Sequence, residues 1–461
     1  MRPSGSLLLV AVSLSLAIAA PARTRPHYGG TLRVAIGETP ASLDPAESNR
    51  LGNSMLPGLS RLIFDTLVTV DARGQAQPAL SPSWQADPGN QRWQFSIRRG
   101  AAFHDGTAVS SDAVAASLRT ANPDWKVFAT GETVIIQCNA PTPDLPAVLA
   151  LPRYGIAKRA GGKVVGSGPF AIERWDPGKK LGLSARDDYW GGRAFLDAIE
   201  VEMGKSFREQ MIALDLGKAD LVEVAPDQAR HVVLEGWRVE SSPPAEWMGL
   251  VFSRDVQSAE EGKLREALAL SIDRDAMNNV LLQGGGEPAG TLLPGWMSGY
   301  AFLFPTTIDL QRARQARDAA RQTPLWTLGY DASDPLARVI AERIALNARD
   351  AGLTLQTTAT AAADIRLVRL PLPSLDTWVA LIELARSLGL PQPKFDGDPL
   401  QQSADASTAY AAESTLLQSQ RVVPLLHLRT AVALATSVMG WREDPDGSWR
   451  LQDVWLESGK P

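Results

Sequence analysis

Segments with the two-residue period of β-strands alternate with segments of helical period along this chain, and this alternation limits its fold most strongly. Leu32, Val34 and Ile36 alternate with polar or small neighbours, which is typical of a half-buried strand. Residues 335–350 instead carry apolar side chains at helical spacing. Such alternation predicts an α/β fold, and 461 residues suffice for two or three domains. Further strands are expected at Trp93–Ile97 and Val134–Gln137.

Residues that favour helix ends mark several helix boundaries. Ser110 precedes a stretch rich in Ala, Val and Leu, where its hydroxyl can cap the first turn. Between residues 260 and 283, Asp273 can cap a second helix that follows the first through a turn. Gly352 is expected to terminate the helix over residues 335–350.

The N-terminus has the layout of a secretory signal peptide, residues 1–22. Arg2 precedes an apolar stretch, Leu7–Ala20, that is too short to span a membrane comfortably. Cleavage is expected after Ala22, which keeps Pro21 away from the scissile bond. The alternative is an uncleaved N-terminal anchor. No cysteine ends the apolar stretch, so no lipid anchor is expected and a periplasmic location is predicted.

Cys138 is the only cysteine, so an exported form of this chain must fold without an intrachain disulfide. It follows a strand-like run and is expected to behave as a small buried hydrophobic residue.

The sequence offers no recognisable chemistry for catalysis. The formal net charge of -5, without long runs of one sign, gives no basic footprint for nucleic acid. The four histidines are scattered, so no metal site is predicted. His104 precedes Asp105 on an expected turn, but no nucleophile motif accompanies them, and His104 is interpreted as a residue that fixes the turn. We therefore predict that the chain is not an enzyme and needs no cofactor.

Several motifs resemble those of the extracellular solute-binding proteins of family 5, a group that includes periplasmic dipeptide-, oligopeptide- and nickel-binding proteins. The resemblance covers nearly the whole mature chain and is strongest up to about residue 300. The motifs stand in the family's order: Gly29–Val34, Ser42–Pro45, Leu80–Trp84, Trp93–Gly100, Phe103–Gly106, Gly166–Phe170, Tyr189–Trp190, Leu264–Leu268, Ile272–Arg274 and Ala412–Leu425.

This resemblance implies a two-lobed periplasmic-binding-protein fold of the class II type, with a subdomain inserted in the first lobe. The expected divisions are a main lobe over 23–58, 166–258 and 430–461, an inserted subdomain over 59–165 and a second lobe over 259–429.

The resemblance also supplies four candidate ligand-binding residues. Thr39 lies in the loop after the first strand, and Trp247 lies in a segment that resembles the one leading from the main lobe into the second. The alternative for Trp247 is a core residue, and the thirteen tryptophans of the chain fit either role. Arg369 and Asp376 lie where peptide-binding members carry a tryptophan-aspartate signature that this chain lacks.

Asp376 has two interpretations. It could pair with the ammonium group of a peptide, or it could cap a helix over residues 377–388, since an aspartate before Trp378 and Leu381 is typical of a helix start. The second is favoured.

The function implied by the resemblance is a receptor that captures a small peptide-like solute for an ABC importer. Its partners would be that ligand and permease subunits at the inner membrane, with no nucleic acid, and we expect a monomer. The alternatives are a degenerate relative that acts as a sensor or chaperone, a binder of a metal chelate or haem, and an exported hydrolase, for which the required catalytic groups were not found.

Overall fold

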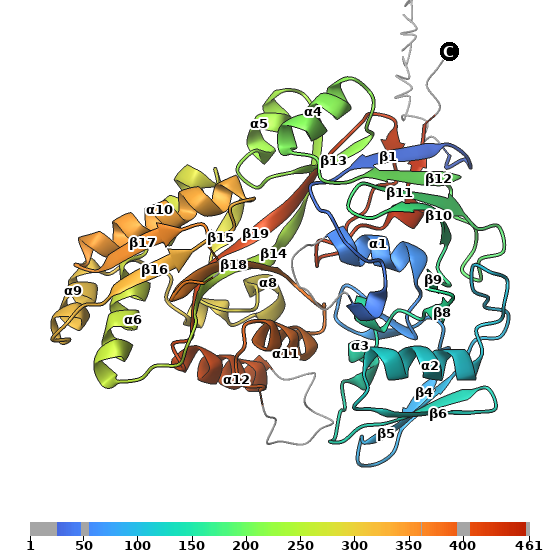
Figure 1. The fold of residues 1–461 in the computed structure, drawn as a ribbon, viewed down its shortest axis with the longest axis horizontal. Helices are drawn as coiled ribbons and strands as arrows, with labels where there is room; N and C mark the ends of the chain where they lie inside the picture. The colour runs from blue at the N-terminus through green and yellow to red at the C-terminus, as the bar shows by residue number, and fades with distance from the viewer. Residues whose placement is uncertain (1–24, 48–54, 361, 394–405, 458–461) are drawn as a thin grey trace, which may run out of the picture.

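The protein has two α/β lobes that share one large β-sheet (Figure 1). The computed structural model describes residues 25–47, 55–360, 362–393 and 406–457. The expected signal peptide, residues 1–22, lies outside them. No helix in the described part of the chain has the length and apolar character that a membrane crossing requires.

The first lobe contains one end of the sheet. Its strands are β1 (Thr31–Ala35), β10 (Phe170–Asp176), β11 (Lys180–Ala185), β12 (Ala198–Glu202) and β13 (Leu221–Val224). Strand β1 pairs in parallel with both β12 and β13, so the carboxyl ends of these three strands lie at one edge. The helices of this lobe are α1 (Met55–Ile63), α4 (Phe207–Asp215) and α5 (Ala229–Leu234).

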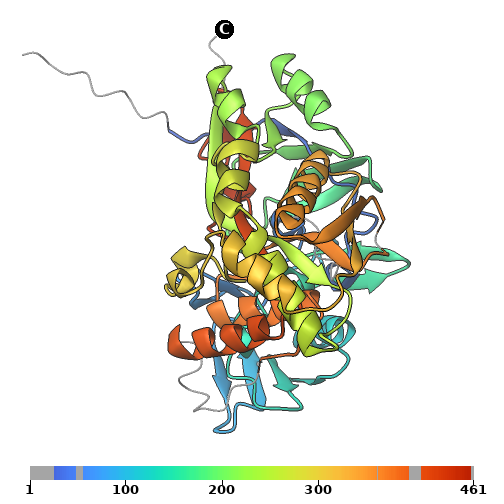
Figure 2. The same ribbon diagram turned by 90° about the vertical axis from the view of Figure 1, so that its left-hand side faces the viewer.

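The second lobe contains the other end of the sheet and most of the longer helices, which stand in front of it in Figure 2. Its strands are β15 (Gly286–Pro288), β16 (Leu325–Gly329), β17 (Thr354–Thr358) and β18 (Ile365–Pro371). Its helices are α6 (Ala259–Ser271), α7 (Arg274–Ala276), η3 (Met277–Leu281), α8 (Gly295–Ser298), η4 (Ala301–Leu303), α9 (Leu310–Asp318), α10 (Pro335–Asp350), α11 (Thr377–Ser387) and α12 (Ala406–Gln418).

Two long antiparallel strands, β14 (Arg238–Phe252) and β19 (Val422–Leu434), cross from one lobe to the other. The sheet order is β10-β11-β12-β1-β13-β19-β14-β18-β16-β17, with β15 beside β19. Strand β13 pairs with β19 in the first lobe, and β18 pairs with β14 in the second. Between these regions the ladder shifts register from Ser241 to Glu246, where Pro243 and Pro244 carry no N–H group. This irregular stretch is the crossing point between the lobes.

A smaller subdomain extends from the first lobe. Its sheet has the order β4 (Trp84–Ala86), β5 (Arg92–Ser96), β7 (Thr133–Gln137) and β6 (Lys126–Thr130), and it packs against α2 (Ser111–Ala121). The described residues also form shorter elements: η1 (Pro45–Glu47), β2 (Val68–Val70), β3 (Ala76–Pro78), α3 (Leu145–Val148), η2 (Pro152–Tyr154), β8 (Lys158–Ala160), β9 (Lys163–Val165), β20 (Val438–Met439), η6 (Leu451–Asp453) and β21 (Trp455–Leu456).

The histidine of the Phe103–Gly106 motif joins this subdomain to the first lobe. The backbone N–H of His104 donates to the carbonyl of Gly166 at 2.9 Å, and its Nε2 lies 3.2 Å from the carbonyl of Gly168. Burial lowers the pKa of His104 to about 4, so the ring is neutral at pH 7. A Cβ on Gly166 would lie 1.9 Å from the carbonyl oxygen of Ile63, which leaves room for glycine only. The turn-fixing interpretation of His104 is confirmed.

The local boundaries expected from the sequence agree with the structure. Ser110 caps α2 by accepting from the backbone N–H of Ala113, and Asp273 caps α7. Helix α10 ends at Asp350, shortly before Gly352 with its positive φ of 78°. Cys138 is buried, as expected. Helix α1 spans the division expected between residues 58 and 59, and the lobe and subdomain divisions stay predictions.

Candidate functional site

The carboxyl ends of β1 and β13 present two glutamates toward the second lobe. Glu38 follows β1, and Glu223 lies on β13. The backbone N–H of Gly37 donates to Oε2 of Glu223 at 2.5 Å, which holds the loop after β1 against β13. In open α/β sheets, ligands bind beyond the carboxyl ends of the parallel strands. These two glutamates therefore mark the first lobe's side of a candidate ligand site.

On the second lobe, Arg369 of β18 is held between two carboxylates. Its Nη2 and Nε donate to Glu246 of β14 at 2.6 and 3.1 Å, and its Nη1 donates to Asp334 at 2.7 Å. Asp334 also caps α10 through its other oxygen, which accepts from Leu336 and Ala337. Burial lowers the pKa of Arg369, but the two carboxylates outweigh burial and hold that pKa above its ordinary value. Arg369 is thus a fixed cation, and three of its five N–H groups donate to these two carboxylates.

The charges of the two lobes act on one another across the site. Burial raises the pKa of Glu38, the carboxylates of Asp331 and Glu246 raise it further, and Arg369 lowers it. Burial also raises the pKa of Glu223, to about 7, and the charge of Glu38 adds to this. We define the interlobe cluster as Glu38, Glu223, Glu246, Asp331, Asp334 and Arg369. Its five carboxylates face a single guanidinium.

Of the predicted site residues, Thr39 and Arg369 lie at or beside this cluster. Thr39 directly follows Glu38 and is exposed, and its side chain lies against Gly178 and Gly204. Arg369 belongs to the cluster itself. Whether either residue contacts a ligand stays a prediction.

Trp247 occupies the core that the alternative interpretation requires. Its side chain is 2 % exposed and belongs to the hydrophobic core that also contains Leu381 and Leu384 of α11. The indole Nε1 donates to the carbonyl of Thr291 at 3.2 Å. Neighbouring residues on a strand point to opposite faces, so Trp247 points away from the face on which Glu246 meets Arg369. Ligand contact by Trp247 stays a prediction.

Asp376 is the N-cap of α11, as the favoured interpretation predicted. Its Oδ1 accepts from the backbone N–H of Val379 at 2.9 Å, and the residue is buried. The charge of Asp376 acts on Asp144 of the inserted subdomain. The structure therefore assigns Asp376 a structural role that is separate from the interlobe cluster.

The sequence analysis missed the five carboxylates of the cluster, Glu38, Glu223, Glu246, Asp331 and Asp334. A signal for the first two existed, because polar residues at the carboxyl ends of adjacent parallel strands are expected to lie together. No such signal existed for the pairing of Glu246 with Arg369, which depends on β18 lying beside β14 in a particular register. Among the residues that the structure describes, no group of histidine, cysteine or carboxylate side chains could hold a metal ion.

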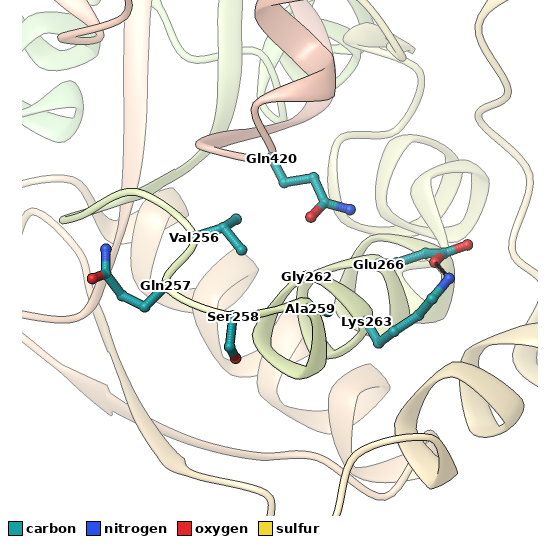
Figure 3. Close-up of a pocket in the computed structure, with 8 residues that line it drawn as sticks. All are labelled: Val256, Gln257, Ser258, Ala259, Gly262, Lys263, Glu266 and Gln420. Carbon is teal, nitrogen blue, oxygen red and sulfur yellow. Dashed lines mark hydrogen bonds and ion pairs between the residues drawn. The ribbon is translucent and has the colours of Figure 1, made fainter.

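A separate, open depression of about 420 Å³ lies at the start of α6 in the second lobe (Figure 3). Among the residues drawn in Figure 3, one ion pair is present, between Lys263 and Glu266 at 2.8 Å. It lies beyond Phe252, roughly 20 Å along β14 from Glu246 at 3.3 Å per residue. The lining residues are Val256, Gln257, Ser258, Ala259, Gly262, Lys263, Glu266 and Gln420. It is therefore distinct from the interlobe cluster.

Comparison with curated proteins gives distant relatives. The chain is 25% identical over 329 residues to the Probable D,D-dipeptide-binding periplasmic protein DdpA of Escherichia coli. The aligned residues cover 64% of this chain and 64% of that relative. It is 23% identical over 378 residues to the periplasmic murein peptide-binding protein MppA of the same organism, covering 72% of this chain and 69% of the relative. The match to the first relative thus spans less than two thirds of that protein's length.

Solved structures share the fold. NikA from Brucella suis in complex with Fe(III)-EDTA superposes with a TM-score of 0.78 at 18% identity, covering 93% of this chain and 100% of that one. DppA from Helicobacter pylori in complex with the peptide STSA gives a TM-score of 0.77 at 19% identity, covering 94% and 99%. These similarities confirm the predicted two-lobed α/β fold.

Residues 75–369 match the family described as bacterial extracellular solute-binding proteins, family 5 Middle. The match confirms the family that the motifs suggested and agrees with a binding protein rather than an enzyme. Since it extends over more than half of the sequence, this chain belongs to the bacterial extracellular solute-binding proteins of family 5.

Proposed function

We propose that this protein is the exported, periplasmic substrate-binding component of an ABC importer, which captures a small peptide-like solute between its lobes and delivers it to permease subunits. The interlobe cluster is the observation that carries the proposal, because side chains of both lobes meet there beside the crossing strands β14 and β19. Closure of the lobes around the solute is the signal to the permease. The protein acts as a monomer.

The charges of the cluster favour a solute with a positively charged group. The carboxylates of Glu246 and Asp334 already neutralise the charge of Arg369, so a ligand carboxylate gains little from it. Glu38 and Glu223, whose pKa values are raised by burial and by neighbouring carboxylates, gain most from a new cation. The amino group of a peptide supplies that cation, and the peptide complex of the Helicobacter relative supports this class. A carboxylate-rich metal chelate or haem fits less well.

Mass spectrometry of small molecules released on denaturation identifies a solute that copurifies with the protein. A thermal-shift panel of paired free and N-acetylated peptides then tests the amine. Saturation at about 100 times the dissociation constant adds about 2.7 kcal/mol of stability. We expect this gain for free-amine peptides and its loss in Glu223→Gln.

Asp376→Asn is the matched control, since asparagine also caps helices and only the charge changes. Its ligand response should equal that of the wild type. Equal shifts for free and acetylated peptides, or a loss confined to Asp376→Asn, would contradict the assignment of the amine to the cluster. A protein from which no solute is released, and which responds to no peptide, would instead fit the sensor or chaperone alternative.

A further inference from the structure

A buried ion pair joins the inserted subdomain to the second lobe. Nη1 of Arg153, in η2, donates to Oε2 of Glu383 of α11 at 2.5 Å, and Nη2 donates to Oε1 at 2.9 Å. The two side chains are 14% and 5% exposed. Two parallel charge-assisted hydrogen bonds of this kind fix both distance and orientation. The pair lies 230 residues apart in the chain and is separate from the strands that cross between the lobes.

The inserted subdomain and α11 make further close contacts around this ion pair. Val379 of α11 is buried in the hydrophobic core of the inserted subdomain. Gly74, with a φ of 77°, lies so near α11 that a Cβ would stand 2.7 Å from the carbonyl oxygen of Leu375. Three separate parts of the inserted subdomain, the turn at Gly74, η2 and the hydrophobic core, therefore meet the beginning and middle of α11. Opening of the lobes has to break all three contacts.

Carboxylates outnumber cations at this interface. Burial raises the pKa of Asp144 to about 6, and the charges of Asp376 and Glu383 raise it further. Arg153 also lies over the ring of Tyr154, 4.8 Å from its centroid. Among the residues that the structure describes, Arg386 also pairs with this group; it donates to Glu383 from the same helix and is 54% exposed. Asp71 and Arg73 flank Gly74, and Asp71 accepts hydrogen bonds from its own turn.

We propose that Arg153 and Glu383 form a latch that holds the inserted subdomain against α11 and shifts the ligand-free protein toward closed lobes, while full closure still requires the solute. Arg153 is a positioning residue, since it acts on closure and needs no contact with a solute. Removal of one partner of a buried ion pair leaves the charge of the other buried and unpaired. Here this should raise the ratio of open to closed protein by roughly 100-fold or more. The inference concerns closure in the absence of solute, so it does not depend on the proposed function.

Small-angle X-ray scattering of the ligand-free mature protein tests the latch. We expect Arg153→Met and Glu383→Gln to increase the radius of gyration relative to the wild type. Arg386→Met is the matched control, because it removes a cation from the same carboxylate without touching the inserted subdomain, and it should leave the radius unchanged. The exchanged pair Arg153→Glu with Glu383→Arg should recover compactness.

Circular dichroism and a cooperative melt establish that each variant is folded. A pH series gives a second readout. Arg153→Met leaves the carboxylates of Asp144, Asp376 and Glu383 facing one another without the Arg153 cation. Protonation of Asp144 relieves that repulsion, so the radius of gyration of the variant should fall toward that of the wild type as pH drops from 8 to 5. Folded single variants with the scattering of the wild type would overturn the latch. An equal expansion in Arg386→Met would also overturn it, because the effect would then belong to α11 alone.

Discussion

At the scale of single residues, Glu413 is a buried carboxylate with no cationic partner among the residues that the structure describes. It accepts from the backbone N–H groups of Leu292 and Leu293 and from the hydroxyl of Tyr300 at 2.7 Å. Burial raises its pKa to about 7, against an ordinary value of 4.5. The folded protein therefore binds a proton here that the unfolded chain releases at lower pH.

This shift predicts a stability contribution from Glu413 that is fully present below about pH 4.5 and lost as pH rises through 7, on the order of 3 kcal/mol. Glu413→Gln should remove that dependence. The measurement is the difference in unfolding free energy between wild type and variant at pH 5 and pH 8, because other groups cancel in the difference. A difference that is the same at both pH values would contradict the shifted pKa.

Trp247 is expected to be worth more to the core than to a ligand. Truncation to alanine removes a buried indole and its hydrogen bond, so Trp247→Ala should cost about 3–5 kcal/mol in denaturant unfolding. Trp296→Ala is the comparison, since Trp296 is 40% exposed and should cost less. A variant at Trp247 that unfolds like the wild type but binds ligand weakly would favour the cleft interpretation.

At the scale of elements, α11 begins at a cap that was readable in the sequence. Asp376→Ala should destabilise the protein by about 1 kcal/mol, whereas Asp376→Ser should retain most of the stability because a hydroxyl also accepts from Val379. Ligand affinity should be the same in Asp376→Ser and the wild type. Loss of binding with retained stability in that variant would restore Asp376 as a ligand residue.

Local signals explain which elements could be predicted. The caps at Ser110, Asp273 and Asp376 depend on residues three positions away, so the sequence contains all that they need. The contacts of Arg153 with Glu383 and of Arg369 with Glu246 join residues more than 100 positions apart. They depend on strand order and lobe packing, which no local pattern encodes. Family resemblance predicted the two lobes but not these pairs.

At the scale of the whole molecule, β14 and β19 belong to both lobes at once. Unfolding of either lobe unpairs strands that the other needs. We therefore expect a single transition in scanning calorimetry of the ligand-free protein, with equal calorimetric and van't Hoff enthalpies. Two resolved transitions would indicate that each lobe keeps its part of the crossing strands independently.

The place of β19 in the sheet also fixes the order in which this protein can be completed. Val422–Leu434 is synthesised after all the other strands of this sheet, yet it lies in the middle of the sheet, between β13 and β14. Until it emerges, β13 and β14 each have an edge without a partner, and unpaired edges invite association with other chains. Neither lobe can finish its sheet before Val422–Leu434 has been made, so the nascent polypeptide has to be protected from aggregation until then.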